Sequence, residues 1–384
     1  MRTIGVVTTS RADYGIYYPV LKAIQAEPEL RLQLYVSGMH LAPVFGSTVR
    51  QIEQDGFEII ERVEMLVASD TPEAISKSMG LGTIGFAQAF ARSRPDILLV
   101  LGDRFEMHAA ALAALPFKIP LAHIHGGEKT EGAIDDALRH SITKLSHWHF
   151  VSTEQYARRV MQLGEDPLRV TVCGAPGLDN IASLKLLTAA ELEARFPIQL
   201  EPAPLIVTYH PVTLEHEDSA RQVENLLGAL EDCGLPVVFT LPNADTGGAV
   251  IRECIAQFVQ THGHAYQADN LGAQAYFSLM QLAKAMVGNS SSGIIEAPSF
   301  GLPVVNIGSR QAGRVMAENV ICCGYERDEI ASAIKRAASD EFAAQITNCI
   351  NPYDAGGAAS IIIKQLKEIE ITPALTHKKF VDRI

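Results

Sequence analysis

The sequence predicts an α/β protein with two doubly wound, Rossmann-like domains facing a cleft. Short apolar runs alternate with longer amphipathic stretches along nearly the whole chain. Most of the runs are continuously apolar, which is typical of parallel strands covered by helices on both faces. The chain has 384 residues, more than one hydrophobic core usually supports, so two domains of about 150–200 residues are expected.

The alternation predicts the following helices and strands. Helices are expected over 14–27, 104–115, 220–234 and 327–338, where apolar residues recur with helical spacing. Strands are expected over 3–9, 31–38, 96–103, 120–125, 147–152 and 169–174 in the first half, and over 204–210, 236–242, 285–291 and 303–308 in the second.

A charged, Pro-containing segment from Leu186 to Leu205 interrupts this alternation before strands resume. We therefore place the domain junction just before it, near Asp179. The predicted domains are residues 1–179 and 180–360, followed by a C-terminal helix and tail over 361–384. In doubly wound sheets, ligands bind outside the carboxyl ends of the strands. The residues directly after each apolar run are therefore the candidates for a functional site.

Composition narrows the classes of function. The net charge of −12 and the absence of a basic run argue against nucleic-acid binding. The N-terminus lacks the apolar core of a signal peptide, and no apolar run approaches the ~20 residues of a membrane helix. We expect a cytoplasmic protein with no membrane partner. The six cysteines show no Cys-x-x-Cys spacing and are expected to be reduced thiols.

Two motif-like stretches do not have the context that their motifs require. "GLGTIG", Gly80 to Gly85, matches a dinucleotide-binding fingerprint but lies in helical surroundings rather than after a strand. "GNSSSG" has Ser292 where the second glycine of a hydrolase nucleophile elbow belongs. No Walker pattern is present either, and we expect no cofactor.

Polar residues come directly after the apolar runs in both halves. In the first half they are Ser10, Arg11 and Asp13 after the first run, and Asp103, Arg104 and Glu106 after the third. In the second half they are His210, Asn243, Ser290, Ser291, Ser292, Gly293, Glu296 and Arg310. Backbone N–H groups and hydroxyls where "NSSSG" opens a helix favour a phosphate, although serines also serve simply as N-caps. Glu296, about one turn later, suits two ribose hydroxyls, and Arg11 and Arg310 suit a diphosphate.

The stretch "LAHIHGGEKTEGAIDDALRHSITKLSH", Leu121 to His147, concentrates acids and imidazoles after an apolar run. Such a set suits proton transfer at a carbon or oxygen centre, and its candidates are His125, Glu128, Glu131, Asp135, Asp136 and Arg139. A metal site at His123, His125 and Glu128 is the competing interpretation, but the His-Glu-x-x-His pattern is absent. We expect no metal, and structural roles for His147 and His149.

Eight motifs in this order resemble those of the hydrolysing UDP-N-acetylglucosamine 2-epimerases. They are "TSRADYG", "SGMHL", "LGDRFE", "HIHGGE", "DDALRHSITKLSH", "STEQYARRVMQLGE", "NSSSGIIEAP" and "VNIGSRQAGR". The resemblance covers almost the whole chain and implies the two-domain glycosyltransferase-B fold. It also implies that the last helix, "GGAASIIIKQLKEI", crosses back to the first domain.

The resemblance implies that UDP is eliminated to leave a glycal, to which water then adds, giving UDP and an N-acetylmannosamine-type sugar for sialic-acid-type biosynthesis. By the family's motifs, Asp103 and the Asp135/Asp136 pair are the acid and base candidates. The UDP-binding positions by the same motifs are Arg11, Arg104, His210, Asn243, Ser290 to Ser292, Glu296 and Arg310. The UDP-sugar and UDP are the expected partners, and a homodimer or homotetramer is the expected assembly.

Two questions stay open in the sequence. Animal members of the family have a catalytic glutamate at the place of His125, so Glu128, Glu131 or His125 itself takes over its work. The preferred substrate is UDP-N-acetylglucosamine. The alternative is its 6-deoxy-4-acetamido analogue UDP-N,N′-diacetylbacillosamine, on the way to legionaminic acid, because "ASDTPEAISKSMGLG", "TEGAIDDALRH" and "GAPGLDNI" look closer to such bacterial members. A glycosyltransferase of the same fold and a nucleotide-sugar binding module without turnover are the remaining alternatives.

Overall fold

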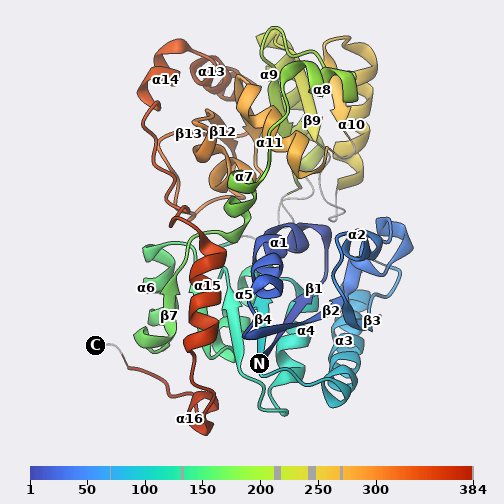
Figure 1. The fold of residues 1–384 in the computed structure, drawn as a ribbon. Helices are drawn as coiled ribbons and strands as arrows, with labels where there is room; N and C mark the ends of the chain where they lie inside the picture. Colours follow the sequence, from blue (N-terminus) through green and yellow to red (C-terminus); the bar gives the residue numbers. More distant parts are fainter. Residues whose placement is uncertain (70, 131–133, 212–217, 241–247, 269–270, 383–384) are drawn as a thin grey trace. The chain divides into compact units, whose positions relative to one another are not determined.

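The computed structural model describes residues 1–384 except 70, 131–133, 212–217, 241–247, 269–270 and 383–384 (Figure 1). Contacts divide the chain into two compact units. Unit 1 consists of Met1–Glu128, Ile134–Asn180 and Tyr353–Ile384, and unit 2 of Lys129–Ala133 and Ile181–Pro352. The division thus falls at Asn180, beside the predicted junction, and the chain returns to unit 1 at Tyr353 rather than at residue 361. Among the described residues, no helix is long and apolar enough to cross a membrane.

Unit 1 contains a sheet of seven described strands. They are β1 (Arg2–Thr8), β2 (Leu30–Ser37), β3 (Ile59–Val63), β4 (Ile97–Leu101), β5 (Leu121–Ile124), β6 (Trp148–Val151) and β7 (Val170–Val172). Their order is β3-β2-β1-β4-β5-β6-β7, and all neighbouring pairs are parallel. The order reverses between β1 and β4, which is where doubly wound sheets bind ligands at the carboxyl ends of the strands.

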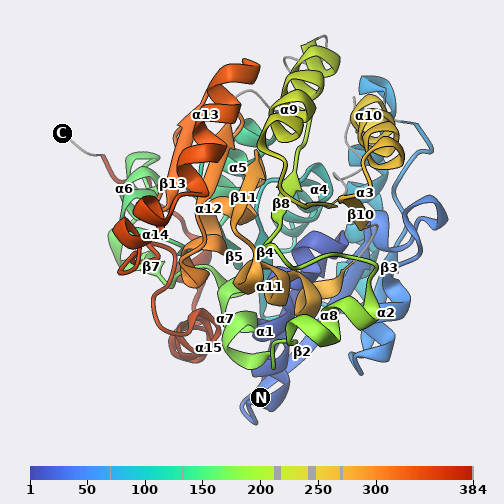
Figure 2. The ribbon, with the colours of Figure 1, turned by 90° about the horizontal axis from the view of Figure 1, so that it is seen from above.

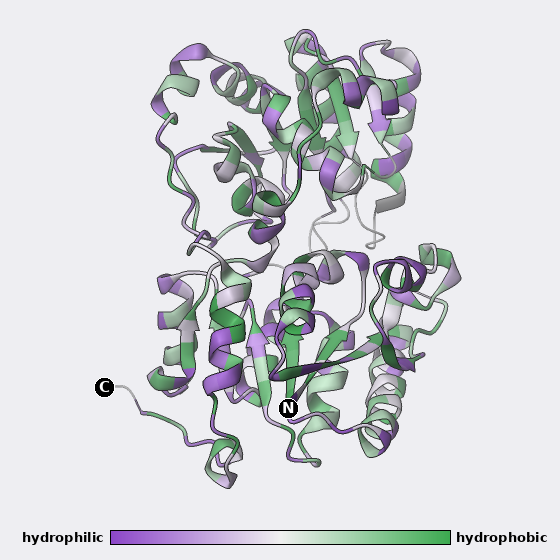
Figure 3. Ribbon diagram, viewed as in Figure 1, coloured by the Kyte–Doolittle hydropathy of each residue, from purple (hydrophilic) through white to green (hydrophobic). Residues whose placement is uncertain are grey.

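Helices cover both faces of this sheet because its central strands are buried on both sides. Figure 3 shows that mostly hydrophobic residues make up these strands. The helices are α1 (Arg11–Ala26), α2 (Val49–Gln54), α3 (Pro72–Arg92), α4 (Phe105–Ala114), α5 (Ile134–Leu145), α6 (Glu154–Gln162), α15 (Ala358–Glu368) and α16 (Pro373–Thr376), with α7 (Asp179–Ser183) at the junction. The "GLGTIG" stretch lies inside α3, so its helical assignment is confirmed.

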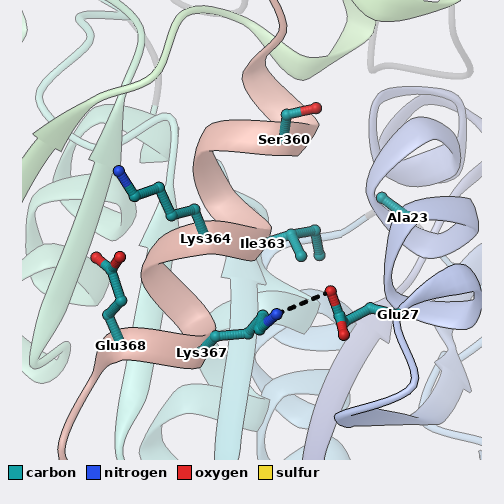
Figure 4. A pocket seen from close by; sticks show the side chains of 7 residues that line it. All are labelled: Ala23, Glu27, Ser360, Ile363, Lys364, Lys367 and Glu368. Carbon is teal, nitrogen blue, oxygen red and sulfur yellow. Dashed lines mark hydrogen bonds and ion pairs between the residues drawn. The ribbon is translucent and has the colours of Figure 1, made fainter.

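The C-terminal helix α15 packs beside α1 in unit 1 (Figure 1). Ile362 and Leu366 of α15 join the same buried cluster as Leu21 and Ile24 of α1. At the edge of this contact Lys367 pairs with Glu27 at 3.1 Å, as Figure 4 shows. The pocket of about 380 Å³ drawn there includes none of the predicted site residues.

Unit 2 contains a second parallel sheet, with the described order β10-β9-β8-β11-β12-β13. Its strands are β8 (Leu205–Thr208), β9 (Val237–Thr240), β10 (Ala265–Ala268), β11 (Ala285–Gly288), β12 (Val304–Ile307) and β13 (Val320–Cys323). Its helices are α8 (Ala189–Arg195), α9 (Ser219–Cys233), α10 (Gly248–Thr261), α11 (Gly272–Leu282), α12 (Ser292–Ile295), α13 (Arg327–Ala337) and α14 (Asp340–Gln345).

Helices again cover both faces of this second sheet. Leu205 and Val207 of β8 pack with Leu226 of α9, whereas Ile206 between them packs with Leu279 of α11. Figure 2 shows α9 and α13 on one side of the strands and α8 and α11 on the other. The predicted fold class of two doubly wound α/β domains is therefore confirmed.

Three edge strands were not predicted from the sequence. They are β3, β10 and β13, each at the end of its sheet and each mostly half-exposed. β3 and β10 are paired on one side only and carry polar residues, so they lack the continuous apolar run by which the central strands were recognised. β13, "VICC", is apolar and has no such explanation, and the fourth edge strand, β7, lies inside the predicted strand over 169–174.

Candidate active site

The turn from β1 to α1 places Ser10, Arg11 and Asp13 at the carboxyl end of the sheet. Ser10 and Asp13 form a capping box at the start of α1. The buried Asp13 carboxylate accepts hydrogen bonds at 2.8 Å from the backbone N–H groups of Thr9 and Ser10, and at 3.0 Å from the hydroxyl of Thr8. Asp13 therefore fixes the turn, while Arg11 is exposed on it.

Asp103 and Arg104 come after β4 on the other side of the sheet's reversal. The guanidinium of Arg104 pairs with the carboxylate of Glu106, which is fully buried, at 3.0 and 3.2 Å. The same guanidinium contacts the sulfur of Met39, which lies in the segment after β2. Glu106 thus holds Arg104 in a defined orientation at the strand end.

His125 comes directly after β5 with a backbone φ of +62°. A left-handed φ is costly for a residue other than glycine, and such positions cluster at functional sites. The imidazole Nδ1 lies 2.6 Å from Oε1 of Glu128, and the hydroxyl of Ser152 donates to the same oxygen at 3.0 Å. Because a carboxylate only accepts hydrogen bonds, Nδ1 carries the hydrogen, which leaves the lone pair of the neutral ring on Nε2.

Arg139 of α5 connects the ends of β4 and β5. Its side chain is 3% exposed and donates at 2.9 Å to the backbone oxygen of His125. It also forms an ion pair with Asp103 and lies 3.7 Å from the second carboxylate oxygen of Glu128. Arg139 therefore orients two of the predicted acid–base residues at once, and its own burial is compensated by two carboxylates.

Asp135 and Asp136 lie in the first turn of α5. Burial, together with the negative charge of Asp103, raises the pKa of Asp135 to about 6. A carboxyl group with this pKa exchanges protons near neutral pH, as a general acid or base requires. Asp136 faces His140 of the same helix at 3.5 Å, the pairing expected from their spacing. Glu131 lies outside the described residues.

The two glycines after His125 serve protein packing in this structure. A Cβ on Gly127, where φ is +78°, would lie 2.5 Å from the backbone oxygen of Tyr156. A Cβ on Gly126 would lie 3.0 Å from the ring of His123. The space beside these glycines is taken by helix α6 and by the buried side chain of His123.

The other histidines of this region have structural partners. His123 bonds the backbone oxygen of Gly102 and the hydroxyl of Thr143, and burial lowers its pKa to about 3. His147 accepts from the backbone N–H of Leu121, and His149 pairs with Glu165. Among the described residues, no group of three or more His, Cys, Asp and Glu side chains is arranged to hold a metal ion.

The second group of predicted residues lies at the carboxyl ends of β8, β11 and β12 in unit 2. Asn289 after β11 exchanges two hydrogen bonds, at 2.7 and 2.8 Å, with the backbone of His210 after β8. Its own backbone oxygen accepts from Arg310 and Gln311 after β12. Burial and the nearby charge of Arg310 lower the pKa of His210 to about 3, so its imidazole is neutral at physiological pH. Asn243 lies outside the described residues.

Ser290 to Ser292 and Gly293 lead into α12, which is only one turn long. The hydroxyl of Ser291 makes no cap bond to this helix, whereas the hydroxyl of Ser290 accepts from the backbone N–H of Ser292 at 3.3 Å. The hydroxyl of Ser292 accepts from Tyr276 at 2.9 Å. One turn of helix carries a smaller dipole than the sequence suggested, so the hydroxyls and backbone N–H groups matter more here.

Glu296 comes directly after α12 and is the most perturbed acid of this group. Burial raises its pKa to about 7. Its buried Oε2 accepts no hydrogen bond from the described residues. A buried acceptor of this kind suits a pair of donor hydroxyls such as those of a ribose.

Several residues that build these two groups were not singled out from the sequence. Ser152, Asn289 and Gln311 each hold a predicted site residue in place, as does Glu106, which the sequence had already placed beside Arg104 at the strand end. Asn289 stands inside one of the family's motifs, so its place after an apolar run was the available signal. Ser152 lies far from Glu128 along the chain and gave no signal.

The amino-acid sequence is similar to those of known nucleotide-sugar 2-epimerases. The family model described as UDP-N-acetylglucosamine 2-epimerase matches residues 22–367. The chain is 40% identical to the GDP/UDP-N,N′-diacetylbacillosamine 2-epimerase (hydrolyzing) of Campylobacter jejuni, over 99% of both chains. It is 36% identical to the UDP-N,N′-diacetylbacillosamine 2-epimerase (hydrolyzing) of Legionella pneumophila, over 98% of this chain and 99% of the relative.

A further relative and a solved structure extend the likeness. The chain is 36% identical to the polysialic acid biosynthesis protein P7 of Escherichia coli, over 100% of this chain and 98% of the relative. The crystal structure of UDP-GlcNAc 2-epimerase from Neisseria meningitidis bound to UDP-GlcNAc superimposes with a TM-score of 0.82 at 20% identity, covering 96% of this chain and 100% of that one. At this identity the superposition shows a common fold, of the glycosyltransferase-B type.

Proposed function

Because the chain belongs to the UDP-N-acetylglucosamine 2-epimerase family, we propose that it is a hydrolysing 2-epimerase acting on UDP-N,N′-diacetylbacillosamine. The observation that carries this choice is chain-long identity of 40% and 36% to two relatives named for that sugar. The sequence alone favoured UDP-N-acetylglucosamine, and the relatives favour its alternative. UDP-N-acetylglucosamine stays the second candidate because a relative from Neisseria meningitidis, 32% identical over 100% of this chain and 99% of its own length, is named UDP-N-acetylglucosamine 2-epimerase.

The proposed reaction needs a base, an acid and charge stabilisation, because the C2 proton of the sugar is only weakly acidic. One group removes this proton while the bond from C1 to the diphosphate oxygen breaks and the electron pair leaves with UDP. The resulting glycal takes a hydroxyl group from water at C1 and a proton at C2 on the opposite face. The products are UDP and the free manno-configured sugar.

We assign the proton transfers to the group at the carboxyl ends of β4 and β5. Asp135 takes the C2 proton, because with a pKa of about 6 it is ionised at neutral pH. His125 returns a proton from Nε2, and the Glu128 carboxylate 2.6 Å from Nδ1 stabilises the positive charge that the ring carries beforehand. Arg139 keeps Asp103 and Glu128 in position through its ion pairs.

We assign UDP to the group in unit 2. The hydroxyls and N–H groups of Ser290 to Ser292 and the guanidinium of Arg310 suit the diphosphate. The unsatisfied carboxylate oxygen of Glu296 suits the ribose. The neutral imidazole of His210 supplies a hydrogen-bond donor without added charge. Ser10, Arg11 and Arg104, at the strand ends of unit 1, are proposed to contact the substrate as well.

Proton NMR in deuterated water tests the reaction and the substrate together. The purified protein is given UDP-N,N′-diacetylbacillosamine or UDP-N-acetylglucosamine, with Asp135→Asn, which lacks the proposed base, as the control of lowered activity. We expect UDP and a free sugar carrying deuterium at C2, and a kcat/KM about tenfold or more higher for the diacetamido substrate. A higher kcat/KM for UDP-N-acetylglucosamine would instead select the second candidate.

Two further outcomes would reject the proposed reaction or the proposed nucleotide. Retention of the C2 proton, or turnover only after an acceptor is added, would favour a glycosyltransferase. If GDP-linked N,N′-diacetylbacillosamine is also supplied and is turned over faster than the UDP-linked sugar, then GDP rather than UDP is the nucleotide of the substrate. A cytoplasmic location, the absence of a cofactor and a homodimer or homotetramer remain our predictions, and light scattering after size exclusion measures the last of these.

A further inference from the structure

We propose that the C-terminal tail, residues 377–382, is a positioning element of the active site, in which Lys378 holds the C-terminal end of α5. This inference rests on the proposed function, because α5 carries Asp135 and Arg139. Lys378 itself lies far from the proposed reacting atoms and acts through the helix.

Lys378 meets the last carbonyl groups of α5 directly. Its ammonium donates to the backbone oxygens of Thr143, Lys144 and Ser146 at 3.2, 2.7 and 2.6 Å. These oxygens belong to the helix end whose carbonyls lack partners within the helix. A cation placed there also interacts favourably with the helix dipole. Lys378 therefore caps α5 from a segment more than two hundred positions away in the sequence.

A buried carboxylate anchors this cap. Glu165, which is 2% exposed, accepts from Lys378 at 2.7 Å, from Lys144 of α5 at 2.6 Å and from His149. Burial alone would raise the pKa of Glu165, but its partners lower it to about 2. Burial lowers the pKa of Lys378 to about 8, which shows that its partners offset the desolvation of the ammonium only in part. Both groups are nevertheless charged at neutral pH, so the ion pair is present there.

Contacts on either side of Lys378 fix the tail. The ring of Phe380 lies against Gly164, where a Cβ would come within 2.3 Å of it, and the ammonium of Lys144 lies 5.0 Å from the ring centroid. The backbone N–H of Val381 donates to Gly164 at 3.0 Å, and Arg169 donates to the backbone of α16. Figure 1 shows the segment after α16 turning back toward this part of unit 1.

The other end of α5 carries the proposed chemistry. Along the helix, Asp135 lies about 16 Å from Ser146 at 1.5 Å per residue. Arg139, between them, contacts Asp103 and the backbone of His125. A shift of about 1 Å in a catalytic group can lower a rate by about a hundredfold. If the C-terminal end of α5 loses its cap, we therefore expect Asp135 and Arg139 to shift and the rate of the reaction to fall.

The experiment compares Lys378→Gln with Lys379→Gln. Lys379 is the adjacent, exposed lysine, so the change in charge and size is the same. For Lys378→Gln we expect faster hydrogen exchange over 134–145 and a kcat about 10- to 100-fold lower. UDP affinity should be unchanged, because α5 carries none of the residues assigned to UDP. Lys378→Arg should restore most of the kcat, since a guanidinium can also donate to the helix carbonyls. Lys379→Gln should change neither quantity.

Two results would overturn the inference. The first is an unchanged kcat in Lys378→Gln while exchange over 134–145 rises, which would make the tail a stability element only. The second is an equal effect of both lysine substitutions. If Lys378→Gln does not fold, Phe380→Ala loosens the tail while keeping the lysine, and the same readouts apply. A wild-type protein without turnover on either UDP-sugar would reject the proposed function, whereas the exchange data would still decide whether Lys378 holds α5.

Discussion

Substitution of Glu128 by glutamine tests the His125 side of the mechanism most directly. The change keeps the size of the side chain and removes its charge. It replaces the charge-assisted contact of 2.6 Å between Glu128 and the imidazole Nδ1 of His125 by a neutral one, and it also removes the negative charge near Arg139. The protonated ring then loses the partner that stabilises it during the reaction.

The magnitude comes from the strength of that contact. A hydrogen bond to a charged group contributes about 1.5–3 kcal/mol, and about 1.4 kcal/mol corresponds to a tenfold change in rate. We therefore expect kcat to fall about 10- to 150-fold in Glu128→Gln. UDP affinity should stay the same, because Glu128 belongs to unit 1 and the proposed UDP site to unit 2.

The assay is steady-state release of UDP together with deuterium incorporation at C2. Glu154→Gln is the matched control, since Glu154 is an exposed glutamate at the start of the neighbouring helix α6. Its kcat should equal that of the wild type. A Glu128→Gln enzyme with unchanged kcat would refute the reasoning and would remove His125 from the proton transfer.

The remaining predictions concern the two other acids of the site and the β1–α1 turn. Asp135→Asn should abolish the rise of kcat/KM that we expect in the wild type as pH increases through about 6, because the ionised carboxylate is the proposed base; an unchanged pH profile would contradict this role. Glu296→Gln should weaken UDP binding about tenfold by calorimetry, because a charged acceptor is lost. The pKa of Glu296 is raised to about 7 in the folded protein, so as pH rises the unfolded state releases this proton before the folded state does. The free energy of unfolding of the wild type should therefore fall between about pH 4.5 and 7. The fall should be smaller in Glu296→Gln, which has no proton to release. Asp13→Ala should lower the melting temperature, because it leaves two backbone N–H groups of the turn without acceptors. Arg11→Ala should instead weaken substrate binding and leave the melting temperature unchanged. Equal melting temperatures of the two variants would refute the assignment of Asp13 to stability and of Arg11 to binding.

The central strands and the residues at their ends were predictable because their signals are local. A parallel strand buried on both faces is a short apolar run, and the residues directly after such a run lie at the ligand-binding edge of the sheet. This logic placed Asp103 and Arg104 after β4 and the serines after β11. Two of the edge strands, β3 and β10, escaped it because they are half-exposed and partly polar.

The sequence by itself determined the two doubly wound sheets, the family motifs and the set of acids and imidazoles near the proposed chemistry. Only the tertiary structure decided how that set is connected. It brought Ser152 to Glu128, turned His125 into a left-handed conformation beside them, and placed Lys378 at the end of α5. Apolar periodicity is a property of neighbouring residues and can be recognised in the sequence. A buried charged group needs a hydrogen-bonding partner, and that partner can come from any part of the chain that the fold brings close to it.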